Sequence, residues 1–209
     1  MRILSVEFDG AIAATGGAAP SEPLSQVAFA GRSNVGKSSL INRLLGRTRT
    51  QMARVSARPG KTREINFYRV RALDDEPDGE RAIAFHLVDL PGFGYAKVPD
   101  AVREAWGEAI DRYLGGSRLL RGVIQLVDAR RPPTADDRRM TEFLGAIGVP
   151  VLVVATKMDK IPRASRKDAE QAAARVLGVD EEQVLGFSSV TGEGREELLA
   201  TLAHLLAGR

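Results

Sequence analysis

The chain has 209 residues, of which 44% are apolar and 27% charged, and its formal net charge is +3. This composition is ordinary for a globular protein, and the length suits one domain with a layered α/β core. There is no cysteine, which excludes disulfides and thiolate metal sites, and no apolar run approaches the roughly 18 residues of a membrane span. Residues 1–14 carry neither a signal nor a transit pattern, so we expect a cytoplasmic protein.

Hydrophobic periodicity predicts strands that alternate with helices along the chain. The expected strands cover residues 3–8, 27–30, 65–70, 83–88, 123–127, 151–155 and 184–187. The expected helices cover residues 39–45, 100–114, 134–144, 164–177 and 193–206. Such alternation predicts a mainly parallel sheet with helices on both faces.

The beginning of the chain does not follow this alternation. The segment 3–8 is expected to be an edge strand, and the stretch 15–23, with its small residues and proline, is expected to be a connection. We therefore expect residues 1–24 to form an N-terminal extension packed on a domain of residues 25–209.

The strands at 65–70 and 83–88 follow each other without a helix between them. We expect them to form a hairpin that adds one antiparallel edge strand to the sheet. Residues 74–80 carry acids and turn signals, so a long connection is expected there.

The segment 31–38 reads GRSNVGKS and matches the P-loop pattern G-x-x-x-x-G-K-S. It follows an expected strand and precedes an expected helix, which is the context a P-loop requires. Backbone N–H groups there can surround a polyphosphate, Lys37 can reach its β- and γ-phosphates, and the Ser38 hydroxyl can ligate Mg²⁺. The alternative is a glycine-rich turn with a chance Lys-Ser pair. The predicted fold class is therefore a three-layer α/β P-loop NTPase.

Two further segments suit a bound nucleotide. Asp89 ends an expected strand and begins the sequence Asp-Leu-Pro-Gly, where it can hold Mg²⁺ through water while the Gly92 N–H contacts a γ-phosphate. Thr62 follows Pro-Gly-Lys in an expected loop, and its hydroxyl can complete the Mg²⁺ shell when a γ-phosphate is present. The alternative for this second segment is a plain turn.

The sequence Thr156-Lys157-Met158-Asp159 follows a buried strand and favours guanine as the base. The Asp159 carboxylate can accept hydrogen bonds from N1–H and N2–H₂ of guanine, a donor pair that adenine lacks. Lys157 can lay its aliphatic stem over the base. The alternative role for Asp159 is a helix N-cap. Backbone N–H groups of Phe187, Ser188 and Ser189 can meet guanine O6, although a strand followed by a serine-rich turn is common.

Charge is unevenly distributed along the chain. Between Arg43 and Arg71 there are nine basic residues and one acid, Glu64, which gives this segment a formal charge of +8. Such segregation indicates an anionic partner near the segment. A solvated face with local salt bridges would give the same pattern.

The order of these motifs is that of a small GTPase, and longer stretches carry a closer resemblance. They are GRSNVGKSSLIN (31–42), RPGKTREINFY (58–68), VDLPGFGYAKVP (88–99), EAWG (104–107), VDARRPPTADD (127–137), ATKMDKIP (155–162) and FSSVTGEG (187–194). On these stretches the chain resembles the bacterial EngB-type GTPases, ribosome-biogenesis factors of the TrmE–Era–EngA–EngB group. The resemblance spans roughly residues 25–206.

The resemblance implies Mg²⁺-dependent binding of GTP and GDP, slow GTP hydrolysis and a role in maturation of the large ribosomal subunit. By motif, it assigns the nucleotide to Gly31, Arg32, Ser33, Asn34, Val35, Gly36, Lys37, Ser38, Gly60, Lys61, Thr62, Arg63, Glu64, Asp89, Leu90, Pro91, Gly92, Thr156, Lys157, Met158, Asp159, Phe187, Ser188 and Ser189. Of these, Ser38, Thr62 and Asp89 are the expected Mg²⁺ ligands. The expected partner is the large subunit or its precursor, contacted through Arg43–Arg71 by a monomer that binds no membrane.

Catalysis is the least defined part of this prediction. Phe93 stands where many GTPases carry a glutamine that orients water, and a phenyl ring cannot do so. The candidates for catalysis are Lys37, Thr62 and Asn34. Asn34 occupies the position that binds K⁺ in related GTPases, so modest stimulation by K⁺ is expected.

Other functions fit parts of the sequence. A P-loop kinase or ATPase would share the phosphate-binding loop, but Thr156–Asp159 favours guanine. A tRNA-modifying GTPase module would need extra domains. A GTPase switch with a non-ribosomal partner stays open.

Overall fold

The computed structural model describes residues 1–13, 16–46, 64–76, 79–92 and 100–208. These residues form an eight-stranded sheet in the order β2-β1-β4-β5-β3-β6-β7-β8. The strands are β1 (Arg2–Ala13), β2 (Gly16–Ala18), β3 (Gln26–Gly31), β4 (Glu64–Glu76), β5 (Gly79–Asp89), β6 (Leu120–Asp128), β7 (Val151–Thr156) and β8 (Val184–Phe187). Strands β5, β3, β6, β7 and β8 run parallel, and β4, β1 and β2 continue the sheet antiparallel from β5.

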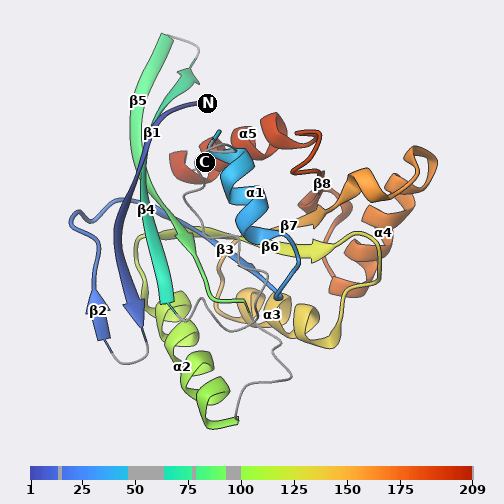
Figure 1. Cartoon of the computed structure of the whole chain (residues 1–209), viewed down its shortest axis with the longest axis horizontal. Helices are drawn as coiled ribbons and strands as arrows, with labels where there is room; N and C mark the ends of the chain where they lie inside the picture. The colour runs from blue at the N-terminus through green and yellow to red at the C-terminus, as the bar shows by residue number, and fades with distance from the viewer. Residues whose placement is uncertain (14–15, 47–63, 77–78, 93–99, 209) are drawn as a thin grey trace.

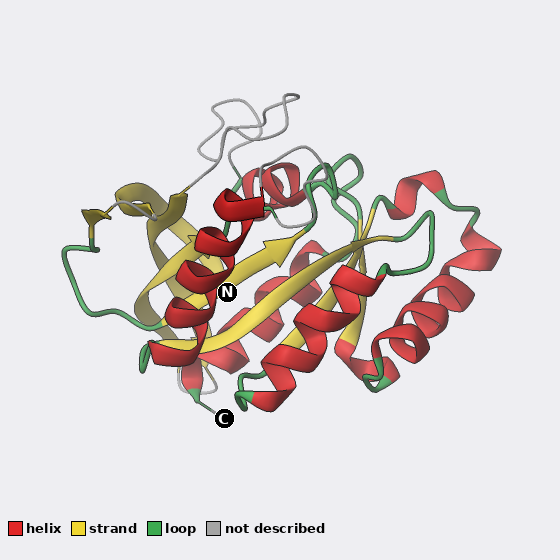
Figure 2. Cartoon of the chain, turned by 90° about the horizontal axis from the view of Figure 1, so that it is seen from below, coloured by secondary structure: helices red, strands yellow, loops and turns green. Residues whose placement is uncertain are grey.

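Helices cover both faces of the sheet, as Figures 1 and 2 show. They are α1 (Lys37–Leu44), α2 (Asp100–Gly116), α3 (Ala135–Ala146), α4 (Arg166–Leu177) and α5 (Arg195–Ala207), with short 3-10 turns η1 (Met158–Lys160), η2 (Arg163–Ser165) and η3 (Glu181–Gln183). The predicted α/β class with a mainly parallel sheet is confirmed. The antiparallel edge is wider than a single strand, because β1 and β2 extend it beyond β4.

The core has two sides because side chains alternate along each buried strand. Along β3, Val27 and Phe29 pack with α1 and α5 on one face. Ala28 and Ala30 pack on the other face, in a cluster with α2 and α3. A third cluster joins β7 to α4. The central strand that leads into the P-loop is therefore buried on both faces, which fixes where the loop begins.

The N-terminal part differs from the expectation. β1 is longer than residues 3–8, and it is not the edge strand, because β2 lies within the expected connection and pairs with it. The carboxylate of Asp9 on β1 lies 2.9 Å from His86 Nε2 on β5 and accepts a bond from Ser21 at 2.8 Å. Polar contacts thus join this region to the sheet, while the boundary drawn at residue 24 stays a prediction.

The long connection expected at residues 74–80 is wrong. β4 continues to Glu76, β5 begins at Gly79, and these two residues pair in register. The acids favour a loop because Asp and Glu are disfavoured in strands. Here Asp74 lies directly across from Arg81 and near the N-terminal ammonium, so opposite charges stabilise the paired strands.

Among the described residues, no helix combines the length and the apolar character that crossing a membrane would require.

Candidate functional site

Four loops that follow parallel strands carry the predicted site residues other than Gly60–Glu64. They follow β3, β5, β7 and β8, and the loop after β6 lies among them in the strand order. Because the carboxyl ends of parallel strands meet at one edge of a sheet, these loops gather in one region. Side-chain contacts join the loop after β3 to those after β5 and β7, and the loop after β7 to those after β6 and β8.

The P-loop has the backbone that its sequence predicts. Gly36 precedes α1 with φ 106°, in a region that side-chain-bearing residues rarely adopt. α1 begins at Lys37 with no side-chain cap, so its first N–H groups remain free to bind an anion. Asn34 also has a positive φ, 65°, which asparagine tolerates better than most residues.

Lys37 and Asp89 form an ion pair between the P-loop and the end of β5. Lys37 is 9% exposed and Asp89 is 3% exposed. Burial lowers the pKa of Lys37 to about 7. The adjacent Asp89 carboxylate favours the charged ammonium in this environment. Lys37 and Asp89, predicted separately for phosphate and for Mg²⁺, therefore contact each other directly.

The loop after β7 is attached to the P-loop by Lys157. Its ammonium donates to the Asn34 carbonyl at 2.7 Å and to Asp128 Oδ2 at 2.8 Å. Lys157 has φ 66°, so both residues joined by the first bond have left-handed backbones. Such strain persists where surrounding contacts enforce it, and it is frequent at functional sites. The side chain extends along the P-loop, as the predicted stacking of its stem on a base requires.

Thr156 joins the same loops from within the core. Its hydroxyl donates to the Val35 carbonyl at 2.6 Å, and the Val127 carbonyl lies 3.0 Å away. Thr156 is 2% exposed. This buried hydroxyl fixes the distance between the P-loop and β7 and does not itself reach outward to a ligand.

The carboxylate of Asp159 is held by the loop after β8. Ser188 Oγ donates to Asp159 Oδ1 at 2.8 Å and accepts from the N–H groups of Val190 and Thr191 at 3.2 and 3.1 Å. The bond from Ser188 lowers the pKa of Asp159, so this carboxyl remains ionised at neutral pH. Within the described part of the chain, Asp159 Oδ2 pairs with the Lys160 ammonium alone, at 3.4 Å, so Asp159 keeps this oxygen for a further partner.

Asp128 belongs to the VDARRPPTADD stretch, and its sequence pattern alone predicts no role for it in the site. It ends β6 and accepts bonds from Lys157 and from the Arg130 side chain and N–H. Burial raises the pKa of Asp128, but these bonds outweigh burial and hold it well below its usual range. Its position at the end of a buried strand, like that of Asp89, was the available signal.

The structure thus brings together the predicted residues of the P-loop, Asp89–Gly92, Thr156–Asp159 and Phe187–Ser189. Gly60, Lys61, Thr62, Arg63 and Phe93 lie outside the described residues. Glu64 is described as the exposed first residue of β4.

A P-loop follows a central parallel strand, and Lys157 bonds it to the loop that carries the Asp159 carboxylate. This arrangement is typical of a P-loop GTPase. A family model described as "50S ribosome-binding GTPase" matches residues 26–157. The "Probable GTP-binding protein EngB" of Gemmatimonas aurantiaca is 44% identical over 207 residues, which cover 99% of this chain and 95% of that protein. The chain belongs to the EngB family of GTP-binding proteins, and it is a GTPase.

Solved structures agree with the fold. A "probable GTP-binding protein engB" has a TM-score of 0.65 at 24% identity, covering 88% of this chain and all of that one. Era in complex with MgGDPNP and a segment of 16S ribosomal RNA has a TM-score of 0.62 at 26% identity. That match covers 86% of this chain and 55% of the Era chain.

Proposed function

We propose that this GTPase is a nucleotide-controlled assembly factor of the large ribosomal subunit, with slow intrinsic hydrolysis. The observation that carries the nucleotide part is the Asp159 carboxylate, fixed by Ser188 in a loop region that Lys157 bonds to the P-loop. The family description, which names the 50S subunit, supports the ribosomal part.

In this proposal each described loop binds one part of GTP. The P-loop from Gly31 to Ser38 surrounds the phosphates, and the Lys37 ammonium exchanges Asp89 for phosphate oxygens. Asp159 accepts the two N–H donors of guanine, while the segment Phe187–Ser189 faces O6. Lys157 lies along the base. GTP is favoured over ATP because adenine would leave the Asp159 carboxylate without a donor pair.

The residues present also fit a magnesium ion. The Ser38 hydroxyl and the Asp89 carboxylate are oxygen donors of the kind that Mg²⁺ prefers. Ser38 lies in the first turn of α1, directly after the P-loop, and Asp89 is the last residue of β5. With Thr62, they would hold the ion. Bound there, Mg²⁺ would neutralise charge on the phosphate oxygens. The Era structure named above carries Mg with its nucleotide, which supports this part of the proposal.

The ribosome contact is proposed for the segment between Arg43 and Arg71, although not all of its basic residues are available for it. Two of its described members are bonded within the protein: Arg43 donates to the Thr191 carbonyl, and Arg69 pairs with Glu7 and Glu22. Arg71 is exposed. The remaining basic residues, at 47–63, lie outside the described residues, and the proposal now depends mainly on them.

The test is co-sedimentation with large ribosomal subunits at fixed K⁺ and Mg²⁺, with GDP or a non-hydrolysable GTP analogue. We expect binding with the analogue only, weakening steeply as salt rises, because phosphate contacts release counterions. Asp159→Asn is a matched control, since an amide at this position suits xanthine in place of guanine. This variant should bind subunits only with a non-hydrolysable xanthosine triphosphate analogue. Equal sedimentation with GDP and the analogue, or none with either, would contradict the proposed role and leave the GTPase family unaffected.

A further inference from the structure

The loop after β8, residues 188–194, presents Ser188 to Asp159 but has little packing of its own. Val190 is 72% exposed and Thr191 is also exposed, so apolar burial does not fix the outer part of the loop. Its shape therefore depends on hydrogen bonds. Within the loop, Gly192 donates to the Ser188 carbonyl at 2.8 Å, and Ser188 donates to the Glu193 carbonyl at 3.0 Å.

One hydrogen-bonded chain leads from the P-loop helix to the Asp159 carboxylate. Arg43, in the last turn of α1, donates from Nη2 to the Thr191 carbonyl at 3.0 Å. Thr191 donates its N–H to Ser188 Oγ at 3.1 Å, and Ser188 donates to Asp159 Oδ1 at 2.8 Å. Each link orients the next, because Thr191 uses its carbonyl for Arg43 and its N–H for Ser188. Bonds in such a chain reinforce one another.

The backbone at residue 192 is suited to this approach. A Cβ atom at Gly192 would lie against the Arg43 guanidinium, and the residue has φ 87°. Only glycine meets both demands without strain.

We propose that Arg43 is a positioning residue for guanine recognition. It touches no base; it fixes Thr191, through which Ser188 and then Asp159 keep the geometry that discriminates guanine. The inference rests on the proposed role of Asp159 as the guanine acceptor. It also gives Arg43 a role within the nucleotide site, in place of the ribosome contact expected from its charge.

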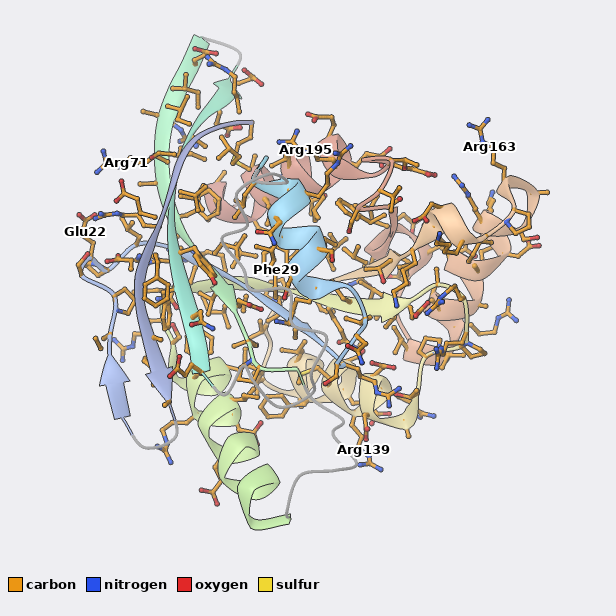
Figure 3. All side chains as sticks on the ribbon, in the orientation of Figure 1. Glu22, Phe29, Arg71, Arg139, Arg163 and Arg195 are labelled. Atoms are coloured by element: carbon orange, nitrogen blue, oxygen red, sulfur yellow. The ribbon has the colours of Figure 1, made fainter. Side chains whose placement is uncertain are left out.

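A second arginine, Arg195, offers a control with a different role. It donates to the carbonyls of Arg43 and Leu44 at 3.2 and 3.0 Å and so satisfies the last carbonyls of α1. It does not bond to Thr191. Figure 3 shows Arg195 beside the end of α1, whereas Arg163 extends outward on the far side of the molecule. Arg163 is exposed, and the described residues provide it with no side-chain bond.

The experiment measures binding of GDP and of inosine diphosphate, which lacks the N2 amine, by calorimetry on the purified full chain. The ratio of the two dissociation constants reports base discrimination, since the phosphates are the same. We expect Arg43→Ala to weaken GDP binding by about fivefold and to reduce the GDP preference by about threefold. Arg43→Lys, which keeps one donor, should recover part of the ratio. Arg195→Ala should lower the thermal midpoint with the ratio unchanged, and Arg163→Ala should change neither.

Asp159→Asn distinguishes a failure of the proposed role of Asp159 from a failure of the inferred role of Arg43. If this variant also keeps the full GDP preference, the proposed role of Asp159 is wrong and the inference falls with it. If Asp159→Asn loses the preference while folded Arg43→Ala retains it, Arg43 has only a structural role and the inference alone is overturned. Should Arg43→Ala not fold, the ratio measured for Arg43→Lys decides in the same way.

Discussion

The two ends of the nucleotide site differ in how their charged groups are bonded. At the base end, Asp159 is held by Ser188 on one oxygen and keeps the other for a donor. At the phosphate end, Lys37 and Asp89 are bonded to each other. In the proposed binding mode, the base end is preorganised for guanine, whereas the phosphate end would exchange one ion pair for contacts with phosphate and Mg²⁺.

This difference separates the choice of the base from the response of the protein to the phosphates. A preorganised carboxylate discriminates bases at little reorganisation cost. An ion pair that must open links phosphate binding to a change in the protein, since Asp89 begins the loop that runs to Gly92. We therefore expect base contacts to set which nucleotide binds, and phosphate contacts to set what the protein does with it.

The largest effect is expected from removing the charge at the phosphate end. Lys37→Ala deletes a buried cation that phosphate oxygens would otherwise contact, so GTP affinity should fall by about a hundredfold and hydrolysis should be lost. Calorimetry and phosphate release measure the two effects. Lys37→Arg keeps the charge with a bulkier head and should recover binding only partly. Unchanged GTP affinity in Lys37→Ala would show that the ion pair is not exchanged.

The second effect changes the choice of base. Asp159→Asn replaces an acceptor by an amide, so GDP affinity should fall by about thirtyfold and xanthosine diphosphate should become the preferred ligand. Competition of both nucleotides against a fluorescent GDP analogue measures this change. A variant that still prefers GDP would remove Asp159 from base recognition.

A smaller effect tests whether preorganisation itself matters. Ser188→Ala leaves the Asp159 carboxylate in place but removes the bond that fixes it, and GDP affinity should fall by about fivefold. The same change should raise the pKa of Asp159 toward its ordinary value, because the Ser188 bond favours the charged form. GDP binding by the variant should then weaken at a higher pH than in the wild type as pH falls below 5 or so. Parallel pH profiles would mean that Ser188 does not influence Asp159.

The smallest effect concerns K⁺ at the phosphate end. We expect GTP turnover to be about threefold faster in K⁺ than in Na⁺, and Asn34→Ala to abolish the difference. Because Asn34 has a positive φ, Asn34→Gly is the better variant: it removes the side chain without straining the backbone. Equal turnover of the wild type in the two salts would end this hypothesis.

Sequence patterns located the described loops of the site because each loop follows a run of apolar residues that predicts a buried strand. The contacts within the site were less accessible. Arg43 and Thr191 are 148 positions apart, and no local pattern distinguishes this arginine from the other basic residues of its segment. The pairing of Lys37 with Asp89 also depends on tertiary proximity, since the sequence patterns assign the two residues to different ligands.

The errors in the fold have a similar origin. The acids near residue 75 favour a loop by intrinsic preference, and cross-strand pairing with Arg81 outweighs that preference. β2 is a short run of small residues, and only its partner β1 makes it a strand. In both places the deciding partner is another strand, which a single segment cannot reveal.

The placement of β1 has a consequence for how the chain folds as it is synthesised. Phe8 pairs with Tyr68 and Arg2 with Leu73, so β1 begins to gain its β4 partners only once residue 64 has been made and completes them at residue 73. Pairs that are distant in sequence form slowly, because a long loop must close first. β1 is therefore expected to wait, with Val6 and Phe8 lacking their β4 partners, for a strand translated much later. Chaperone binding to nascent chains would be concentrated in that interval.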